Sequence, residues 1–167
     1  NGCGFINTPS VTLSTGTADI SGGVLNGFNV TRGDILFEGQ DVNATNLDSF
    51  DIISRTASFA SSVYAGGELN VITGSNHVDY NTKVVTPIAA TGSVLQVAID
   101  SSALGGMYAG KINLVATENG VGVNTSGKLG ASVGDIKITA AGLIEYKDAN
   151  AKGSIKITST GSSVKHS

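Results

Sequence analysis

A cluster of charged side chains between residues 38 and 55 is the part of the chain best suited to acid–base chemistry. Its members are Glu38, Asp41, Asp48, Asp51 and Arg55. Two carboxylates on one face can cleave a glycosidic bond, one as general acid and the other as base or nucleophile. The spacing of Asp48 and Asp51 does not fix a shared face. The expected roles are therefore turn capping and, for Arg55, a surface ion pair.

Two possible metal ligands, His77 and Asp79, flank Val78 and would share one face of an extended segment. No third or fourth ligand joins them at a recognisable spacing. The glycine-rich pieces match neither the phosphate-binding patterns nor the nonapeptide repeat that binds calcium. The sequence therefore predicts no metal-binding and no cofactor-binding residue.

Two serine pairs, Ser61-Ser62 and Ser101-Ser102, are the candidate nucleophiles. A serine needs a base partner, and the histidines of the chain are only His77 and the near-terminal His166. No catalytic set of residues is expected, and we predict that the chain is not an enzyme. Met107-Tyr108 is expected to pack at a corner of the fold and not to bind a ligand.

A short repeated unit predicts the elements that must position these residues. Gly134–Thr139 reads Gly-Asp-Ile-Lys-Ile-Thr, and Gly153–Thr158 repeats it 19 residues later as Gly-Ser-Ile-Lys-Ile-Thr. Apolar residues two apart indicate a strand with one buried face. A single short strand cannot bury that face alone, so the repeat predicts a solenoid of stacked parallel strands. Looser copies begin at Gly33, Gly67 and Gly110.

The composition agrees with an all-β solenoid. The 167 residues include 23 Gly, two Pro, no Trp and 5% aromatic residues, and small and β-branched types dominate. The net charge of −3 and the scattered basic residues give no footprint for nucleic acid. No apolar run approaches the roughly 18–20 residues that span a bilayer. We expect one β-helix domain over residues 1–167, with three short strands per coil and a loop or protruding hairpin within residues 75–93.

Several segments look familiar when they are taken together. They are Gly2–Pro9, Phe50–Arg55, Leu69–Gly74, Leu104–Ile112 and Thr117–Val123. In this order they resemble the secretion domain of two-partner-secretion exoproteins, a family that includes filamentous haemagglutinin, the contact-dependent inhibition toxins and the haemolysins of the Serratia and Proteus type. Among these the chain looks most similar to the haemolysins.

The resemblance implies a right-handed parallel β-helix with a few antiparallel strands outside it. It also implies a secreted or cell-surface protein, associated with the outer membrane, and a cognate outer-membrane β-barrel transporter as partner. The family's Cys-x-x-Cys motif is represented only by Cys3, since the first cysteine is missing. The amino-terminal cap is missing as well, so the chain resembles a fragment whose binding to the transporter is impaired. A lone cysteine forms no internal disulfide, and Cys3 is otherwise expected to be a small, partly buried residue.

The expected function is that of a secretion and folding module on which further coils stack. Ile155 and Ile157 would form a templating edge for the following coils of the parent exoprotein, and Ile136→Asp or Ile155→Asp would abolish templating. Lysis of red cells, through contact with the host-cell membrane, would belong to the parent by resemblance alone. Two alternatives are an adhesin that binds host ligands through residues 75–87 and a carbohydrate-active β-helix enzyme that uses Asp48 and Asp51.

Overall fold

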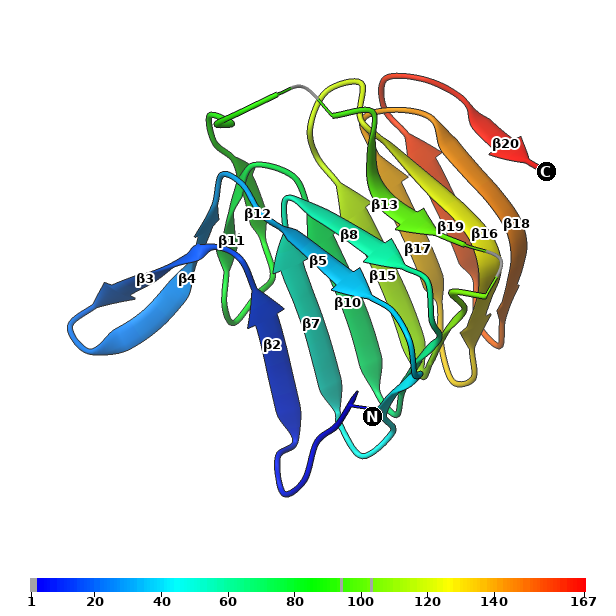
Figure 1. Cartoon of the computed structure of the whole chain (residues 1–167), viewed down its shortest axis with the longest axis horizontal. Helices are drawn as coiled ribbons and strands as arrows, with labels where there is room; N and C mark the ends of the chain where they lie inside the picture. Colours follow the sequence, from blue (N-terminus) through cyan, green and yellow to red (C-terminus); the bar gives the residue numbers. More distant parts are fainter. Residues whose placement is uncertain (1–2, 94, 103) are drawn as a thin grey trace.

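The fold is a column of stacked coils from which a small antiparallel sheet projects (Figure 1). The structure is a computed structural model and describes residues 3–93, 95–102 and 104–167. All the regular elements of the described residues are strands. They form a six-stranded parallel sheet, a ten-stranded parallel sheet and a four-stranded antiparallel sheet. The expected all-β parallel β-helix with extra antiparallel strands is confirmed.

The six-stranded sheet, called the flat sheet below, contains the sequence repeat. Its strands, in spatial order, are β19 (Ile155–Ser159), β17 (Ile136–Ala140), β15 (Lys111–Ala116), β10 (Glu68–Thr73), β7 (Ser49–Ser54) and β2 (Ser10–Ser14). Neighbours pair in parallel, and Ile136 lies opposite Ile155 as the repeat predicted. The two near-identical units are therefore successive coils.

The ten-stranded sheet consists of two columns that complete each coil. One column contains β5 (Asp34–Phe37), β8 (Thr56–Phe59), β13 (Val97–Ser101) and β20 (Val164–His166). The other contains β1 (Cys3–Gly4), β6 (Val42–Ala44), β9 (Val63–Ala65) and β14 (Met107–Ala109). The long strands β16 (Gly122–Ala131) and β18 (Ile144–Ala151) run through both columns. A coil thus has three stretches of strand, as expected.

The core is a set of aliphatic rows that run along the column. Leu69, Ile112 and Ile136 occupy equivalent positions in three successive coils and are at most 1% exposed. Val71, Leu114 and Ile138 form a second such row. Burial of one such side chain contributes about 1.5–3 kcal/mol. Each coil is stable because its neighbours cover these side chains.

The antiparallel sheet arises from insertions in two coils. It contains β3 (Thr17–Ser21), β4 (Val24–Val30), β11 (Asn76–Asp79) and β12 (Val85–Pro87), in the order β12-β11-β4-β3. The hairpin expected within residues 75–93 is β11 and β12. Its sheet covers part of the outer face of the flat sheet, where Val30 and Val78 pack against Ile53 and Ile72. The flat sheet is therefore buried on both faces at this place.

Several local expectations were wrong. The copy of the repeat at Gly33 forms β5, which pairs with β8 in the ten-stranded sheet and not in the flat sheet. The pattern misleads here because a short apolar alternation fits a strand of either sheet. The pattern from Phe5 to Thr8 suggests a strand, but these residues form none, and the strand at this end of the chain is the short β1. The polar tail from Gly161 to Ser167 has the composition of a frayed end, yet Val164–His166 form β20 through parallel pairing with β18. Alternation from Val94 to Ile99 predicts a strand; Val94 lies outside the described residues, and the observed strand, β13, begins at Val97.

The glycine that opens the repeated unit allows close approach of successive coils. A Cβ atom at Gly67 would overlap the carbonyl oxygen of Asp48 in the preceding coil. At Gly110 it would lie 2.8 Å from the carbonyl oxygen of Gly67. At Gly67 and Gly110 the unit therefore begins with glycine because backbone passes directly over backbone at this corner.

Candidate functional site

The acidic cluster does not form a carboxylate pair. Asp51 is 2% exposed, and Lys83 Nζ lies 2.7 Å from Asp51 Oδ2. Ser49 and Asn70 each donate a hydrogen bond of 2.9 Å to Oδ1 of the same carboxylate. Asp48 is exposed in the turn before β7. No hydrogen bond links these two carboxylates in the described part of the chain.

The remaining acids of the cluster lie at the surface, and Arg55 does not. Glu38 and Asp41 are exposed, and Asp41 accepts a hydrogen bond of 2.9 Å from the Ser62 amide. Arg55 is only 6% exposed, so the expected surface ion pair was wrong. The insertion between β10 and β15 covers its guanidinium, which a reading of the local sequence does not reveal.

The partner of Arg55 is Glu118, 63 residues further along the chain. Nε lies 2.8 Å from Oε1 and Nη2 lies 3.1 Å from Oε2, a two-pronged contact. The guanidinium also donates to the carbonyl oxygens of Thr91 and Ser93. The hydrogen bond from Arg55 lowers the pKa of Glu118. Arg55 therefore ties the segment after β12 to the column.

His77 and Asp79 make separate contacts. His77 Nδ1 lies 2.9 Å from Asn29 Oδ1 on β4. Asp79 Oδ1 accepts hydrogen bonds from the backbone amides of Asn81 and Thr82, and these bonds, chiefly that from Thr82, lower its pKa. Across residues 3–93, 95–102 and 104–167 no group of three His, Cys, Asp or Glu side chains is arranged to hold a metal ion.

The candidate serines have structural surroundings. Ser61 is buried, and its hydroxyl has no hydrogen-bond partner among the described residues. Ser62 donates to the carbonyl of Leu104, and the hydroxyl of Ser101 accepts from the amide of Gly127. Ser102 Oγ accepts from the Leu104 amide at 3.3 Å. Neither His77 nor His166, whose Nε2 lies 2.8 Å from the carbonyl of Lys147, contacts them.

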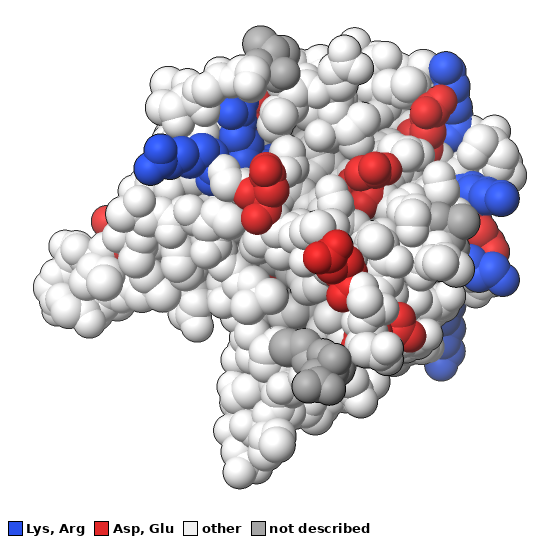
Figure 2. All heavy atoms as spheres, in the orientation of Figure 1, with Lys and Arg blue, Asp and Glu red and all other residues white. Residues whose placement is uncertain are grey.

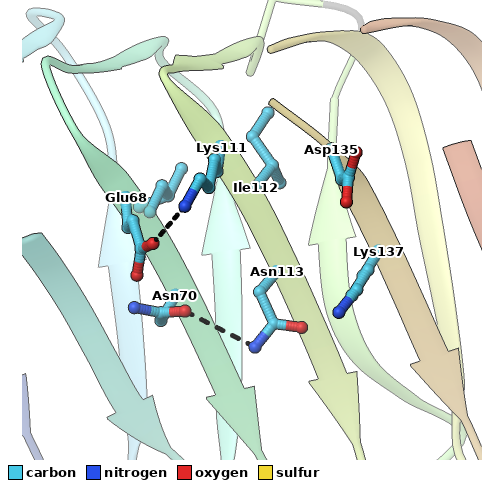
Figure 3. Close-up of a pocket in the computed structure, with 8 residues that line it drawn as sticks. Glu68, Asn70, Lys111, Ile112, Asn113, Asp135 and Lys137 are labelled. Carbon is cyan, nitrogen blue, oxygen red and sulfur yellow. Dashed lines mark hydrogen bonds and ion pairs between the residues drawn. The ribbon is translucent and has the colours of Figure 1, made fainter. Parts of the chain in front are cut away.

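A polar hollow of about 290 Å³ lies on the outer face of the flat sheet (Figure 3). Lys111 Nζ lies 3.0 Å from Glu68 Oε1, and this hydrogen bond raises the lysine pKa. Two residues further along the same two strands, the side-chain amide of Asn113 donates a hydrogen bond of 3.4 Å to Asn70 Oδ1. Asp135 and Lys137 follow on the next coil. Opposite charges alternate, so the hollow attracts neither anions nor cations strongly.

The turn of the β11–β12 hairpin is fastened to the flat sheet by Lys83 and Asp51. We expect Lys83→Met to lower the free energy of unfolding by about 1–3 kcal/mol, because the buried carboxylate of Asp51 would lose its cation. The loss is limited because Ser49 and Asn70 still donate hydrogen bonds to this carboxylate. Hydrogen exchange should show faster opening at Asn76–Asp79. Lys128→Met removes an exposed pair of 3.8 Å and is the control. Equal hydrogen-exchange rates at Asn76–Asp79 in the two variants would show that the ion pair of Lys83 with Asp51 does not hold the hairpin against the flat sheet.

The end of the column offers an exposed strand edge. Ile155 on β19 is 44% exposed, and Ile157 is partly buried against the core. β19 pairs with β17 on one side and has no second strand neighbour among the described residues. A hollow of about 500 Å³ lies beside Ile155, Ile157 and Tyr146. At the other end Cys3 pairs through its backbone with Val42; its side chain lies outside the described part of the structure.

Charge is sparse on the surface. Figure 2 shows acidic side chains spread over one face of the column and basic ones gathered towards its margins. That face has no continuous basic field of the kind that binds nucleic acid. In the described residues no helix has the length and apolar character needed to cross a bilayer.

The family follows from the match to residues 1–146, which fit the family model described as "TPS secretion domain". The chain belongs to this family. A crystal structure of the filamentous hemagglutinin secretion domain agrees, with a TM-score of 0.88 and 31% identity over 99% of this chain and 58% of that one. The likeness to two-partner-secretion domains is therefore confirmed, and such domains belong to secreted, surface-exposed exoproteins.

Relatives of this TPS secretion domain bear the name CdiA, and three of them illustrate the match. "Toxin CdiA" of Yersinia pestis is 45% identical over 86% of this chain, and "tRNA nuclease CdiA-2" of Burkholderia pseudomallei is 46% identical over 85%. "16S rRNA endonuclease CdiA" of Enterobacter cloacae is 42% identical over 95%. This chain spans only 4–5% of their lengths. These names are those of toxins and nucleases and lend no support to the expected haemolysin.

Proposed function

We propose that this domain is the secretion and folding module of a large exoprotein. Family membership implies a cognate outer-membrane transporter as its partner. The observation that carries the folding role is the edge of β19. There Ile155 lies in register with Ile136 and Ile112. The strand that follows covers each of the other two residues, whereas no later strand of the described chain covers Ile155, which is exposed.

The energetic argument concerns each added coil. Two or three inward aliphatic side chains, each contributing about 1.5–3 kcal/mol on burial, roughly offset the ordering entropy of a short coil. Folding can therefore spread in one direction along the column, since a coil needs only its predecessor. Stepwise stacking outside the cell would bias export outward.

The activity of the parent exoprotein lies outside these residues in our proposal. The relatives are named as toxins and nucleases, which favours a toxin as parent. Lysis of red cells and contact with a host membrane have no further support, and attachment to the outer membrane is proposed for the parent by family likeness. Burial of Asp51 and its ion pair with Lys83 support a non-enzymatic domain, because this carboxylate is not available to a substrate. Adhesion through residues 75–87 has no further support.

Ile155→Asp in the parent exoprotein tests the proposal. In the parent, the next coil would bury residue 155 in the same way that β19 buries Ile136. A carboxylate at position 155 therefore opposes stacking of that coil. We expect at least about a tenfold loss of protease-resistant exoprotein in the medium of cells that express the transporter. The isolated domain should keep its melting temperature, because Ile155 is partly exposed in it. Ile136→Asp does not serve equally, because Ile136 is fully buried and the change would unfold the domain itself.

Val133→Asp is the matched control, because Val133 is 67% exposed in a turn away from the edge. It should leave secretion and folding unchanged. Omitting the transporter should abolish export of the wild type. Equal yields of folded exoprotein from the Ile155→Asp and Val133→Asp variants would refute the templating edge, and export of a parent that lacks the whole domain would refute the secretion role.

A further inference from the structure

Two tyrosines form a stacked pair on the outer face of the column. Tyr64 on β9 and Tyr108 on β14 lie opposite each other in register. Their ring centroids are 5.1 Å apart and their planes differ by 11°. Tyr64 is 38% exposed and Tyr108 is partly exposed. We call this pair the tyrosine platform.

Two glycines let the Tyr108 ring lie low across the sheet. A Cβ atom at Gly130, the register partner of Tyr108 on β16, would lie 3.0 Å from Tyr108 Cδ1. At Gly106 it would lie 2.7 Å from Tyr108 Cε2. A larger residue at either position would push the ring away. The glycines thus keep a flat aromatic surface close to the backbone.

A hollow of about 290 Å³ opens beside the platform. Thr45, Ser132 and Asn150 line it beside the two tyrosines. The hydroxyls of Thr45 and Ser132 donate hydrogen bonds to Asn43 Oδ1 (2.7 Å) and to the carbonyl oxygen of Ala109 (3.2 Å), so towards a ligand they act as acceptors. Asn150 on β18 is the register partner of Gly130, one strand beyond it. No charged side chain lines the hollow among the described residues. The site therefore combines an aromatic face with hydroxyl and amide groups.

We propose that the tyrosine platform binds one ring of a neutral glycan. The C–H face of a pyranose is apolar and stacks on an aromatic ring, while its hydroxyls both donate and accept hydrogen bonds, as an amide and hydroxyls require. Asn150 lies two strand spacings, about 9.6 Å, from Tyr108, with Gly130 between them. The Tyr108 ring leans over Gly130, which has no side chain, so a sugar ring would lie on the open face of this ring, between it and Asn150. A phosphate-bearing ligand would find no cation here.

An added strand of a partner protein is a poorer fit to this place. β14 already pairs with β9 on one side and β16 on the other, so it offers no free backbone edge. Recognition must then use side chains, and those present are neutral. A small, specific pocket of aromatic and polar groups is typical of a small-molecule site.

Titration of the ¹⁵N-labelled domain with chitohexaose, cellohexaose, maltohexaose and xylohexaose tests the proposal. At least one of these neutral oligosaccharides should cause saturable amide shifts at Gly106, Tyr108, Gly130 and Asn150. Tyr108→Ala should weaken that binding by at least about tenfold, because the stacking surface is lost. Tyr108→Phe should stay within about threefold, since it keeps the ring.

Tyr146→Ala, on β18 and away from the hollow, is the matched control and should bind like the wild type. If Tyr108→Ala fails to fold, Gly130→Val, which displaces the ring, takes its place, and the wild-type shifts still locate the site. Absence of saturable shifts with all four sugars, or shifts confined to other residues, would overturn the proposal. Equal or tighter binding of the oligonucleotide dT12 at these residues would overturn it as well.

Discussion

Replacing Arg55 by methionine is expected to lower the free energy of unfolding by about 3–5 kcal/mol, because Glu118 would remain largely buried without its cation. The carbonyl oxygens of Thr91 and Ser93 would also lose their donors. Urea unfolding of the purified domain measures the change. The protein should lose stability without losing its β-sheet spectrum at low denaturant.

The double variant Arg55→Met with Glu118→Met should recover part of that loss, because no unpaired charge is then left. Lys111→Met, which breaks an exposed pair, should be close to the wild type. A loss in Lys111→Met as large as that in Arg55→Met would show that burial of the pair is unimportant. Additive losses in the double variant would show that the two side chains do not act together.

The same pair gives a pH dependence of known sign. Arg55 holds the pKa of Glu118 below its ordinary value of 4.5. The stabilisation is therefore fully present above that value and is lost as the pH falls through the lowered pKa. The stability difference between wild type and Glu118→Gln should narrow as the pH falls from 7 towards 3. A constant difference over this range would contradict the assignment.

Gly67→Ala is expected to cost about 3 kcal/mol of unfolding free energy, because the new methyl group would overlap the backbone carbonyl of Asp48. Backbone in a packed coil cannot move aside as a side chain can. The turn that joins β9 to β10 would have to shift, and the register of the flat sheet with it. Thermal and urea unfolding measure the loss.

Gly134→Ala is the matched control at the same position of the repeat. A Cβ atom there would lie 2.7 Å from Lys111 Cγ, and its nearest neighbours all belong to that flexible side chain. The change should therefore cost less than about 1 kcal/mol. Similar losses in the two variants would mean that glycine serves the repeat through chain flexibility and not through close approach.

The strands of the column could be predicted from sequence because they depend on local alternation. Ile136 and Ile155 repeat within 19 residues, and each needs only the adjacent coil. The antiparallel sheet was harder to predict. Its core joins Val30 and Val78 to Ile53 and Ile72, which come from four separate segments that no local pattern relates.

The polar contacts could not be predicted because they depend on the insertions. Arg55 meets Glu118 across 63 residues, and no local pattern relates the two. Asp51 faces outward from β7 and would be exposed if the turn containing Lys83 did not cover it. Tyr64 and Tyr108 are register partners because the chain from Glu68 to Lys111, 43 residues further on, forms one coil with an inserted hairpin, although this separation is about twice the 19-residue repeat.

The tolerance of the column for uneven coil lengths has a practical consequence. Equivalent positions in the flat sheet are separated by 39 residues between Thr12 and Asp51 but by 19 between Asp51 and Asn70, yet the ladder is unbroken. The turn at Gly22-Gly23, with positive φ at both glycines, joins the strands of the projecting β3–β4 hairpin far from that ladder (Figure 1). A foreign epitope or reporter peptide spliced into this turn would be displayed on a stalk while the scaffold beneath keeps its architecture.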